Sequence, residues 1–299
     1  MKKILIIGGT GFIGYHLAKE CLKLSWSVTS LSSKKPKTTR LLKKVNYLNC
    51  DISKGKKLNK LLKKNIYDFV VNLGGYINHF DKIKTYNAHF LGVKNLANIF
   101  LNKKLKSFVQ IGSSAEYGKV VSPQNEKFTC KPTMIYGKSK LRATNFLLKL
   151  FKKRKFPVTI LRFYQVYGPK QNIDRFIPLL IDACIKNTQF QASHGKQKRD
   201  FLYVDDAVYA ILKTLNNKMS DGKIVNIGSG KPITLLSLMK RIKKKIGGGD
   251  ILLGKIKLRK DEPLIIFPYL NNAIKILNWK SKTTLKNGIN KTIESYMKK

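Results

Sequence analysis

Two side chains with the chemistry to move a proton lie four residues apart in the sequence. They are Tyr136 and Lys140, in the pattern Tyr-x-x-x-Lys. On a helix, residues four apart share a face, so the ammonium group would lie beside the phenol. An ammonium favours the phenolate and lowers the pKa of a phenol from ~10 toward neutral pH. Such a phenol can exchange a proton with a sugar or alcohol oxygen, and we predict that Tyr136 and Lys140 are catalytic.

A serine-rich segment upstream is a candidate for orienting the same oxygen. Residues 109–118 have the sequence Val-Gln-Ile-Gly-Ser-Ser-Ala-Glu-Tyr-Gly, which indicates a strand that ends in a loop. In a parallel sheet the carboxyl ends of the strands form the ligand crevice. A hydroxyl group from this loop can hydrogen-bond the reacting oxygen there. The alternative is a serine-rich turn without a catalytic role.

A glycine-rich turn near the start of the chain predicts a site for a dinucleotide. It has the spacing Gly-x-x-Gly-x-x-Gly, follows an apolar strand-like run and precedes a helical pattern. Glycines allow the tight turn, the approach of backbone to a pyrophosphate and close helix–strand packing. The helix start then offers free N–H groups and a positive dipole end to the anion. The predicted cofactor contacts here are Gly8, Gly11, Phe12, Ile13 and Gly14; the alternative is a purely structural turn.

The end of the second predicted strand indicates which dinucleotide binds. A site for NAD usually places a carboxylate here, which accepts a hydrogen bond from the adenosine ribose. The segment Ser32-Ser33-Lys34 lies here instead, and no acidic residue occurs between Glu20 and Asp51. These residues can bind a 2′-phosphate, so we predict NADP(H), with NAD still possible. Asp51 is expected to bind the adenine amino group or, alternatively, to cap the next helix.

Composition excludes several classes of protein. The chain has 299 residues, of which 43% are hydrophobic and 25% charged, as in a globular protein of one or two domains. No apolar run approaches the ~18 residues that a membrane span needs. Four scattered cysteines and four histidines have no metal-ligand spacing, so neither a metal site nor a disulfide scaffold is expected. A reducing, cytoplasmic location is consistent with this cysteine usage.

The net charge of +44 is high, but its distribution argues against a dedicated nucleic-acid binder. Only eight of the 60 basic residues are arginine, and the lysines are spread over the whole chain. Nucleic-acid binders usually cluster their basic residues and use arginine to contact bases and phosphates. A generally lysine-rich protein is therefore the preferred interpretation. An RNA- or dinucleotide-binding protein without catalysis is kept as an alternative.

Alternating strand and helix patterns predict an α/β fold with a doubly wound parallel sheet of the Rossmann type. Strand-like runs occur at 3–7, 27–32, 45–49, 67–73, 107–112 and 157–162. Helical patterns occur at 12–24, 53–63, 88–101 and 135–153. We expect a dinucleotide-binding domain over 1–163 and a smaller α/β substrate domain mainly over 164–299. Residues of about 201–228 are expected to return to the first domain.

Taken together, the motifs resemble the extended short-chain dehydrogenases/reductases, and specifically the NAD(P)-dependent nucleotide-sugar epimerase/dehydratase/reductase group. The resemblance covers nearly the whole chain. It rests on Gly8 to Gly14, Asp51-Ile52, Asn72-Leu73-Gly74-Gly75, Ser113 to Gly118, Tyr136 to Lys140, Arg162 to Pro169, Arg199 to Asp206, and Leu277-Asn278-Trp279 followed by Gly288.

The resemblance implies roles for individual residues. Tyr136 would be the acid/base, Lys140 would contact the nicotinamide ribose, and Ser113, four residues before Tyr117, would hold the sugar oxygen. The remaining implied contacts are Ile52, Leu73 and Gly74 for the cofactor, and Ser114, Gln165, Arg199 and Arg259 for the nucleotide sugar. For Arg199, the alternative is a salt bridge to Asp205 or Asp206. The resemblance also implies a homodimer formed by helices that match 88–101 and 135–153.

Departures from the family pattern narrow the expected reaction. Dehydratases and decarboxylases of this group carry a carboxylate two residues before the tyrosine of the Tyr-Gly pair, where this chain has Ala115; Glu116 lies next to Tyr117 instead. His89 and Gln165 both replace a family asparagine. We therefore expect reduction of the C4 keto group of a nucleotide-activated 4-keto-6-deoxyhexose. The alternative is a nucleotide-sugar 4-epimerase that retains NAD.

Overall fold

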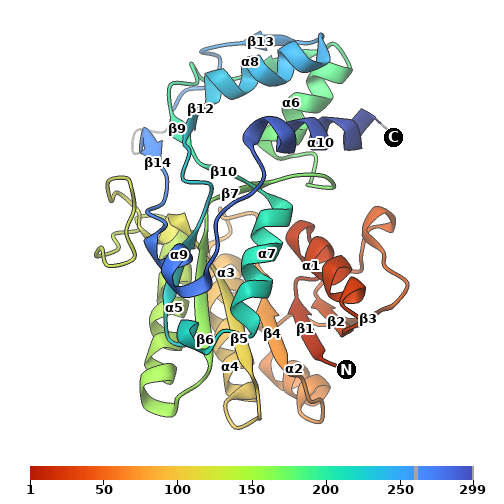
Figure 1. Cartoon of the computed structure of the whole chain (residues 1–299), viewed down its shortest axis with the longest axis vertical. Coiled ribbons are helices and arrows are strands. Elements are labelled where there is room, and N and C mark those ends of the chain that lie inside the picture. The colour runs from red at the N-terminus through yellow and green to blue at the C-terminus, as the bar shows by residue number, and fades with distance from the viewer. Residues whose placement is uncertain (259–261, 298–299) are drawn as a thin grey trace.

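The computed structural model describes residues 1–258 and 262–297, and its main element is a parallel sheet (Figure 1). Among the described residues the sheet has seven strands in the order β11-β6-β5-β4-β1-β2-β3. Every neighbouring pair is parallel. The strands are β1 (Lys3–Ile7), β2 (Ser27–Ser32), β3 (Val45–Asn49), β4 (Phe69–Asn72), β5 (Ser107–Ser113), β6 (Val158–Phe163) and β11 (Ile224–Ile227). The predicted doubly wound parallel sheet is confirmed.

The strand order reverses between β1 and β4, which lie side by side although they are far apart in sequence. Ile7 at the end of β1 is in register with Asn72 at the end of β4. The chain then leaves β1 toward β2 and leaves β4 toward β5, in opposite directions across the sheet. Such a reversal opens a crevice at the carboxyl ends of the strands, where ligands bind in open α/β sheets.

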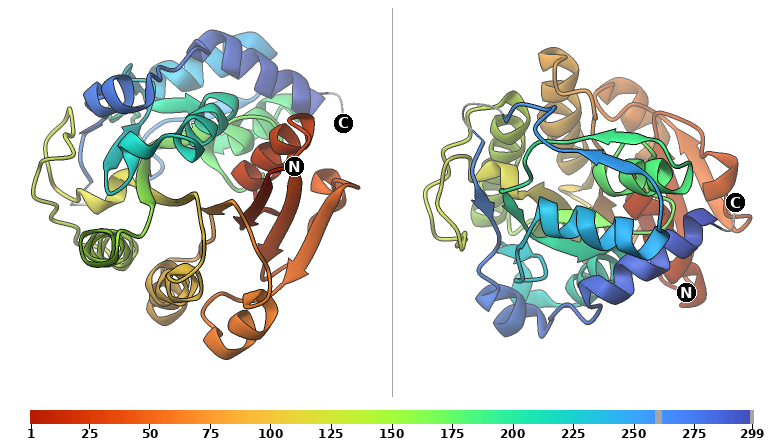
Figure 2. Two further views of the ribbon diagram at one scale, coloured as in Figure 1. Left: turned by 60° about the horizontal axis from the view of Figure 1, so that its bottom comes forward. Right: turned by 90° about the horizontal axis from the view of Figure 1, so that it is seen from above.

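Helices cover both faces of the sheet (Figure 2). One face carries α1 (Phe12–Lys23), α7 (Val204–Leu215) and α9 (Asn271–Leu277). The other carries α2 (Gly55–Leu62), α4 (Gly92–Phe100) and α5 (Ile135–Arg154). Because both faces are buried, neighbouring residues of one strand enter different cores, which explains the nearly continuous apolar runs of the strands. In β1, Ile4 and Ile6 face α1, whereas Leu5 and Ile7 face the opposite core.

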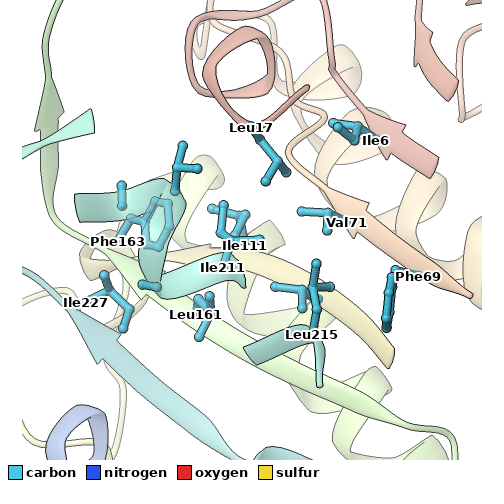
Figure 3. Packing of buried hydrophobic residues seen from close by; sticks show 14 of the residues in the cluster. Ile6, Leu17, Phe69, Val71, Ile111, Leu161, Phe163, Ile211, Leu215 and Ile227 are labelled. Carbon is cyan, nitrogen blue, oxygen red and sulfur yellow. The ribbon is translucent and has the colours of Figure 1, made fainter. Parts of the chain in front are cut away.

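Figure 3 shows part of the core on the α1 and α7 face; the side chains that it labels come from β1, β4, β5, β6 and β11 and from α1 and α7. Phe69 and Val71 of β4 point toward Leu215 of α7, and Leu17 of α1 lies over Ile6. All five of these side chains are fully buried. The crevice at the carboxyl ends of the strands therefore lies next to a closely packed hydrophobic core.

A second lobe lies over the carboxyl ends of the strands (Figure 1). The chain enters this lobe directly from the end of β6. Its own core packs α6 (Phe176–Ile185), α8 (Leu235–Ile246) and α10 (Leu285–Met297) against short strands. The short strands are β7 (Gln165–Tyr167), β8 (Gln189–Gln191), β9 (Lys198–Arg199), β10 (Phe201–Tyr203), β12 (Ile233–Thr234), β13 (Asp250–Leu252) and β14 (Ile265–Ile266). No helix in the described part of the chain is long and apolar enough to cross a membrane.

After β10 the chain returns from the second lobe to the large sheet. The helix α7 packs on α1 and β5, and β11 adds to the sheet edge beside β6. Residues 204–227 thus pack with the large sheet and with α1, which follows the glycine turn. β6 ends at Phe163, and we propose that the first domain ends there.

One predicted helix has an unexpected shape. The region predicted as a helix over 88–101 is a longer run that begins with α3 (Lys82–Tyr86), continues through a π-helical turn, η2 (Asn87–Leu91), and ends as α4. His89 is the buried residue of this turn. Single π-helical turns often occur at functional sites, because they redirect one side chain.

A buried carboxylate anchors the C-terminal segment to the large sheet. Asp206, at the start of α7, accepts hydrogen bonds from the backbone N–H groups of Lys282 and Thr283, at 3.1 and 2.9 Å. The indole N–H of Trp279 donates to the carbonyl oxygen of the same aspartate at 3.2 Å. The segment that leads into α10 is therefore tied to α7.

We predict that Asp206→Ala lowers the free energy of unfolding by about 1 to 3 kcal/mol, because two backbone donors lose their acceptor. Urea denaturation followed by circular dichroism measures the change. The control is Asp205→Ala, because the side chain of Asp205 is 60% exposed and lies 3.8 Å from His16. That variant should stay within about 0.5 kcal/mol of the parent. Equal losses in the two variants would contradict the anchoring role.

Candidate functional site

The glycine turn forms the floor of the crevice. Gly8 has a φ of +77°, a conformation that suits glycine, and its N–H donates to the carbonyl oxygen of Leu31 at 2.8 Å. A Cβ atom on Gly14 would lie 2.3 Å from the oxygen of Gly8, so this glycine lets α1 start directly against the turn. The residue before α1, Gly11, makes no side-chain cap. The first N–H groups of the helix are thus left for an external acceptor.

These features fit the pyrophosphate of a dinucleotide. Three of the four residues before α1 are glycines, and the N-terminal end of α1 supplies N–H donors and a positive dipole. Phe12 and Ile13 begin the helix and turn their side chains into the hydrophobic core of the second lobe. They offer backbone rather than side-chain groups to a cofactor. The predicted contacts of Gly8, Gly11, Phe12, Ile13 and Gly14 thus lie on one short stretch of backbone.

The end of β2 lies beside this turn without any carboxylate. Ser32 is buried, and its hydroxyl accepts from the N–H of Thr10 at 3.4 Å, whereas Ser33 and Lys34 are exposed. Arg40, in the short helix η1 (Thr38–Arg40), donates to Asn172 of the second lobe at 2.6 Å. Ser33 and Lys34 thus have exposed side chains, while Ser32 contacts the glycine turn. Binding of a 2′-phosphate at this end of β2 stays a prediction.

The remaining predicted cofactor residues line the neighbouring loops. Asp51 accepts from the N–H of Ser53 at 2.9 Å, so its carboxylate supports a local turn and does not cap α2, which starts after Lys54. Ile52 is buried in the core, where it leaves no room for a side chain on Gly92. Leu73 and Gly74 follow β4 and lie against the glycine turn. Their contacts with the cofactor stay predictions.

The structure brings the three predicted catalytic side chains together. Ser113 ends β5, and Tyr136 and Lys140 lie one turn apart on α5. Lys140 is buried, its ammonium lies 5.9 Å from the ring centre of Tyr136, and it donates to the carbonyl oxygen of Ile111 at 2.6 Å. The side chain of Ser113 acts on the phenol and lowers its pKa. A hydroxyl, a phenol and an ammonium thus share one edge of the sheet.

The pKa of Tyr136 differs from the sequence-based expectation. Burial raises the pKa of the phenol, and the hydrogen bond to Ser113 and the charge of Arg175 oppose this only in part. The expected lowering of the phenol pKa by Lys140 is wrong for the chain alone: Lys140 is not among the groups that shift this pKa, and its ammonium donates to a carbonyl oxygen on β5. Burial also lowers the pKa of Lys140 to about 8. At neutral pH Tyr136 is therefore protonated and ready to donate.

Two histidines surround the ring of Tyr136. His79, from the loop after β4, stacks on it with ring centres 4.1 Å apart, and His89 meets its edge at 4.9 Å. His89 is buried, and its Nε2 is within hydrogen-bonding distance of both the N–H and the carbonyl oxygen of Tyr76, at 3.2 and 3.1 Å. Burial lowers the pKa of His89 to about 3 and lowers that of His79 as well. Both rings are neutral at pH 7, and the buried ring of His89 packs against the edge of Tyr136.

Sequence reasoning missed His79 and Arg175. His79 reaches Tyr136 from an irregular loop. Arg175, the exposed residue before α6, has a charge that acts on both His79 and Tyr136. Neither residue belongs to a spacing motif, because each comes from a loop that only the tertiary structure places over the crevice. Arg175 thus brings a positive charge from the second lobe to bear on the catalytic edge.

The predicted substrate residues have different surroundings. Ser114 is half-buried in the turn after β5, and Gln165 is exposed at the start of β7. Arg199 is buried, and its guanidinium pairs with Glu262 at 2.7 Å. The alternative partners Asp205 and Asp206 were therefore wrong, and a diphosphate would have to share this guanidinium with Glu262. Arg259 lies outside the described residues.

Comparison with known proteins places this geometry in a family. The NAD dependent epimerase/dehydratase family matches residues 4–228. The chain is 31% identical over 280 residues to the dTDP-D-glucose 4,6-dehydratase of Dictyostelium discoideum, in a match that covers 81% of this chain and 62% of that relative. It is 26% identical over 316 residues to a Bacillus subtilis protein named as an uncharacterized UDP-glucose epimerase, with 97% and 96% of the two chains covered.

A solved structure shares the whole fold. The UDP-glucose 4-epimerase of Thermotoga maritima, determined with UDP-glucose, superposes with a TM-score of 0.93 over 99% of both chains. Its sequence identity to this chain is 22%, so the likeness concerns the fold. Both lobes of the present structure, and not only the sheet, have counterparts in that enzyme.

We predict that Gly14→Ala weakens binding of NADP and NAD by about tenfold or more, because the new methyl group would displace the turn. Fluorescence titration or calorimetry measures the dissociation constant. The matched control is Gly55→Ala at the start of α2, where a Cβ atom would meet only the side chain of Asn95, at 3.2 Å. Unaltered dinucleotide binding by Gly14→Ala would remove the turn from the cofactor site.

Proposed function

Since this chain belongs to the NAD-dependent epimerase/dehydratase family, we propose that it reduces the C4 keto group of a nucleotide-activated 4-keto-6-deoxyhexose with NADPH. Two of its relatives carry the names of enzymes of nucleotide sugars. The observation that carries the choice of reaction is the carboxylate-free end of β2 at Ser33 and Lys34. This end of β2 favours NADPH, which a reductase consumes when it reduces the sugar.

In this proposal the three side chains at the sheet edge handle the proton. When bound, NADPH supplies the hydride that adds to C4 of the sugar. Tyr136 donates its phenolic proton to the C4 oxygen, and the hydroxyl of Ser113 orients that oxygen. The raised pKa of the buried phenol supports this direction, because a reductase needs the protonated acid at neutral pH.

The turn after β5 argues against water elimination. The resemblance places the acid/base carboxylate of dehydratases two residues before Tyr117, and Ala115 occupies that position. Glu116 is fully buried, so it does not replace that group in the crevice. The similarity to a named dehydratase therefore extends to the fold and the cofactor site, while the elimination step lacks its residue here.

A nucleotide-sugar 4-epimerase is the second candidate, favoured by the epimerase names of a sequence relative and of a solved structure. It would use the same three residues, but the phenol would have to accept a proton before donating one. The cofactor would be NAD that stays bound and is regenerated in each cycle. For either reaction we propose a homodimer that pairs through α4 and α5.

The stoichiometry of the reaction separates the two candidates. Purified protein is mixed with UDP-, GDP-, CDP- or dTDP-linked 4-keto-6-deoxyhexoses and either NADPH or NADH, and absorbance at the nicotinamide band is followed. We expect one NADPH to be consumed for each sugar reduced, with NADH less effective. Interconversion of UDP-hexoses without net cofactor turnover would establish the epimerase instead.

We predict that Tyr136→Phe lowers kcat by about 100-fold or more, because the proton donor is lost while the ring is kept. Dinucleotide binding should survive, since the glycine turn is untouched. The control is Tyr47→Phe, a partly buried tyrosine whose hydroxyl accepts from the N–H of Leu42 at 3.0 Å, away from α5. Full turnover by Tyr136→Phe would exclude the phenol as the acid.

A further inference from the structure

A glutamate lies fully buried directly beneath the catalytic edge of the sheet. Glu116 ends the short helix η3 (Ser114–Glu116), which follows Ser113. Its side chain has 0% exposure, as does the ring of the following Tyr117. An isolated buried carboxylate is costly, so its retention requires compensating partners.

Partners from three elements surround this carboxylate. One oxygen accepts from the backbone N–H of Ser113 at 2.9 Å. The other accepts from the hydroxyl of Thr144 on α5 and from two guanidinium nitrogens of Arg162 on β6, each at 2.9 Å. The carboxylate thus joins the catalytic strand, the catalytic helix and the next strand of the sheet.

The backbone leaves space for this group. A Cβ atom on Gly112 would lie 2.5 Å from the carboxylate of Glu116. The carboxylate therefore fills the position beside β5 that a side chain at residue 112 would otherwise take. It reaches the N–H of Ser113 only because that space is open.

Ser113 depends on this contact for its orientation. Its hydroxyl accepts from the N–H of Ala115 at 3.1 Å, and its own N–H is held by Glu116, which together form a capping box over η3. The side chain of the same serine acts on the phenol of Tyr136 and lowers its pKa. A shift of Glu116 would therefore move the hydroxyl that meets the phenol.

Glu116 and the buried Lys140 bind the same strand end: the ammonium donates to the carbonyl oxygen of Ile111 at 2.6 Å, and the carboxylate accepts from the N–H of Ser113, two residues further along β5, at 2.9 Å. The charge of Glu116 therefore acts on the lysine. Burial lowers the pKa of Lys140, and the negative charge of Glu116 is the influence that opposes this. Without that charge the ammonium would be deprotonated at a lower pH. The other charged or titratable groups that act on this cluster or on its members are Tyr136, His79, His89, Tyr117, Cys130, Arg162, Arg175, Glu126 and Tyr164.

We propose that Glu116 is a positioning residue of the active site, which holds the Ser113 hydroxyl against Tyr136 and keeps Lys140 protonated while Arg162 balances its charge. The proposal rests on the proposed function, in which these three residues act on the sugar. Glu116 itself does not touch the reacting atoms. It acts through the backbone of β5 and through its charge.

The decisive measurement is the titration of Lys140 by nuclear magnetic resonance of protein labelled with ¹³C at the lysine ε-carbons. Comparison with Lys140→Met assigns the resonance, which is expected to titrate near pH 8 in the parent. In Glu116→Gln we expect this midpoint to fall by about one pH unit, because a nearby opposite charge is removed. A midpoint within about 0.3 units of the parent in the folded variant would overturn the proposal.

The matched control is Glu126→Gln. Glu126 is half-buried and also accepts a backbone N–H, that of Asn226 at 2.8 Å, but it does not act on Lys140. Its variant should leave the Lys140 midpoint unchanged. If Glu116→Gln does not fold, the double variant Glu116→Gln/Arg162→Met removes both buried charges together, an exchange that proteins often tolerate. The midpoint of Lys140 is expected to fall there too, and an unchanged midpoint would again overturn the proposal.

Kinetics test the orientation of Ser113 once a sugar substrate is known. Glu116→Gln should lower kcat by about tenfold or more, with little change in KM for NADPH, because a catalytic hydroxyl is displaced. The titration needs no substrate, so it tests Glu116 even if the protein reduces no sugar. Conversely, normal reduction by Glu116→Gln with an unshifted Lys140 would refute the positioning role and leave the proposed reaction intact.

Discussion

The close approach of β1 and β4 at the reversal of the sheet is the constraint on which the site depends. A Cβ atom on Gly8 would lie 3.0 Å from the backbone of Leu73 and Gly74, so the two loops touch without side chains between them. This contact brings the turn that begins α1 against the loop that leads to His79. The strand order therefore holds the loops expected to contact the cofactor and the sugar at one edge of the sheet.

The catalytic edge lies on a buried cluster of charge rather than on an apolar core. Glu116 pairs with Arg162, and its charge reaches Lys140, so two cations and one anion lie beneath Tyr136. Buried ion pairs add little stability compared with apolar packing, because desolvation offsets the attraction. Their value here lies in orientation and protonation: each group is held by neighbours from a different strand or helix. Stability comes instead from the two apolar cores that enclose the sheet.

The two lobes are joined across the crevice by polar contacts. Arg40 reaches from the β2 side to Asn172, and His16 of α1 lies 2.9 Å from the carbonyl oxygen of Pro169. The loop after β7 is thus held from the cofactor side of the crevice. Arg40 would have been a plausible phosphate ligand by residue type alone, yet the structure uses its guanidinium to fasten the lobes.

The sequence by itself determined the features that depend on local spacing: the strand and helix order, the glycine turn, and the placement of Tyr136 and Lys140 on one helix face. These follow from backbone periodicity and need no knowledge of distant neighbours. Only the tertiary structure decided which groups meet. It placed His79 on the ring of Tyr136, paired Arg199 with Glu262, and raised the pKa of the phenol that proximity to lysine was expected to lower. Burial and charge at a site are set by segments far apart in the chain, so the residue pattern of one segment cannot give them.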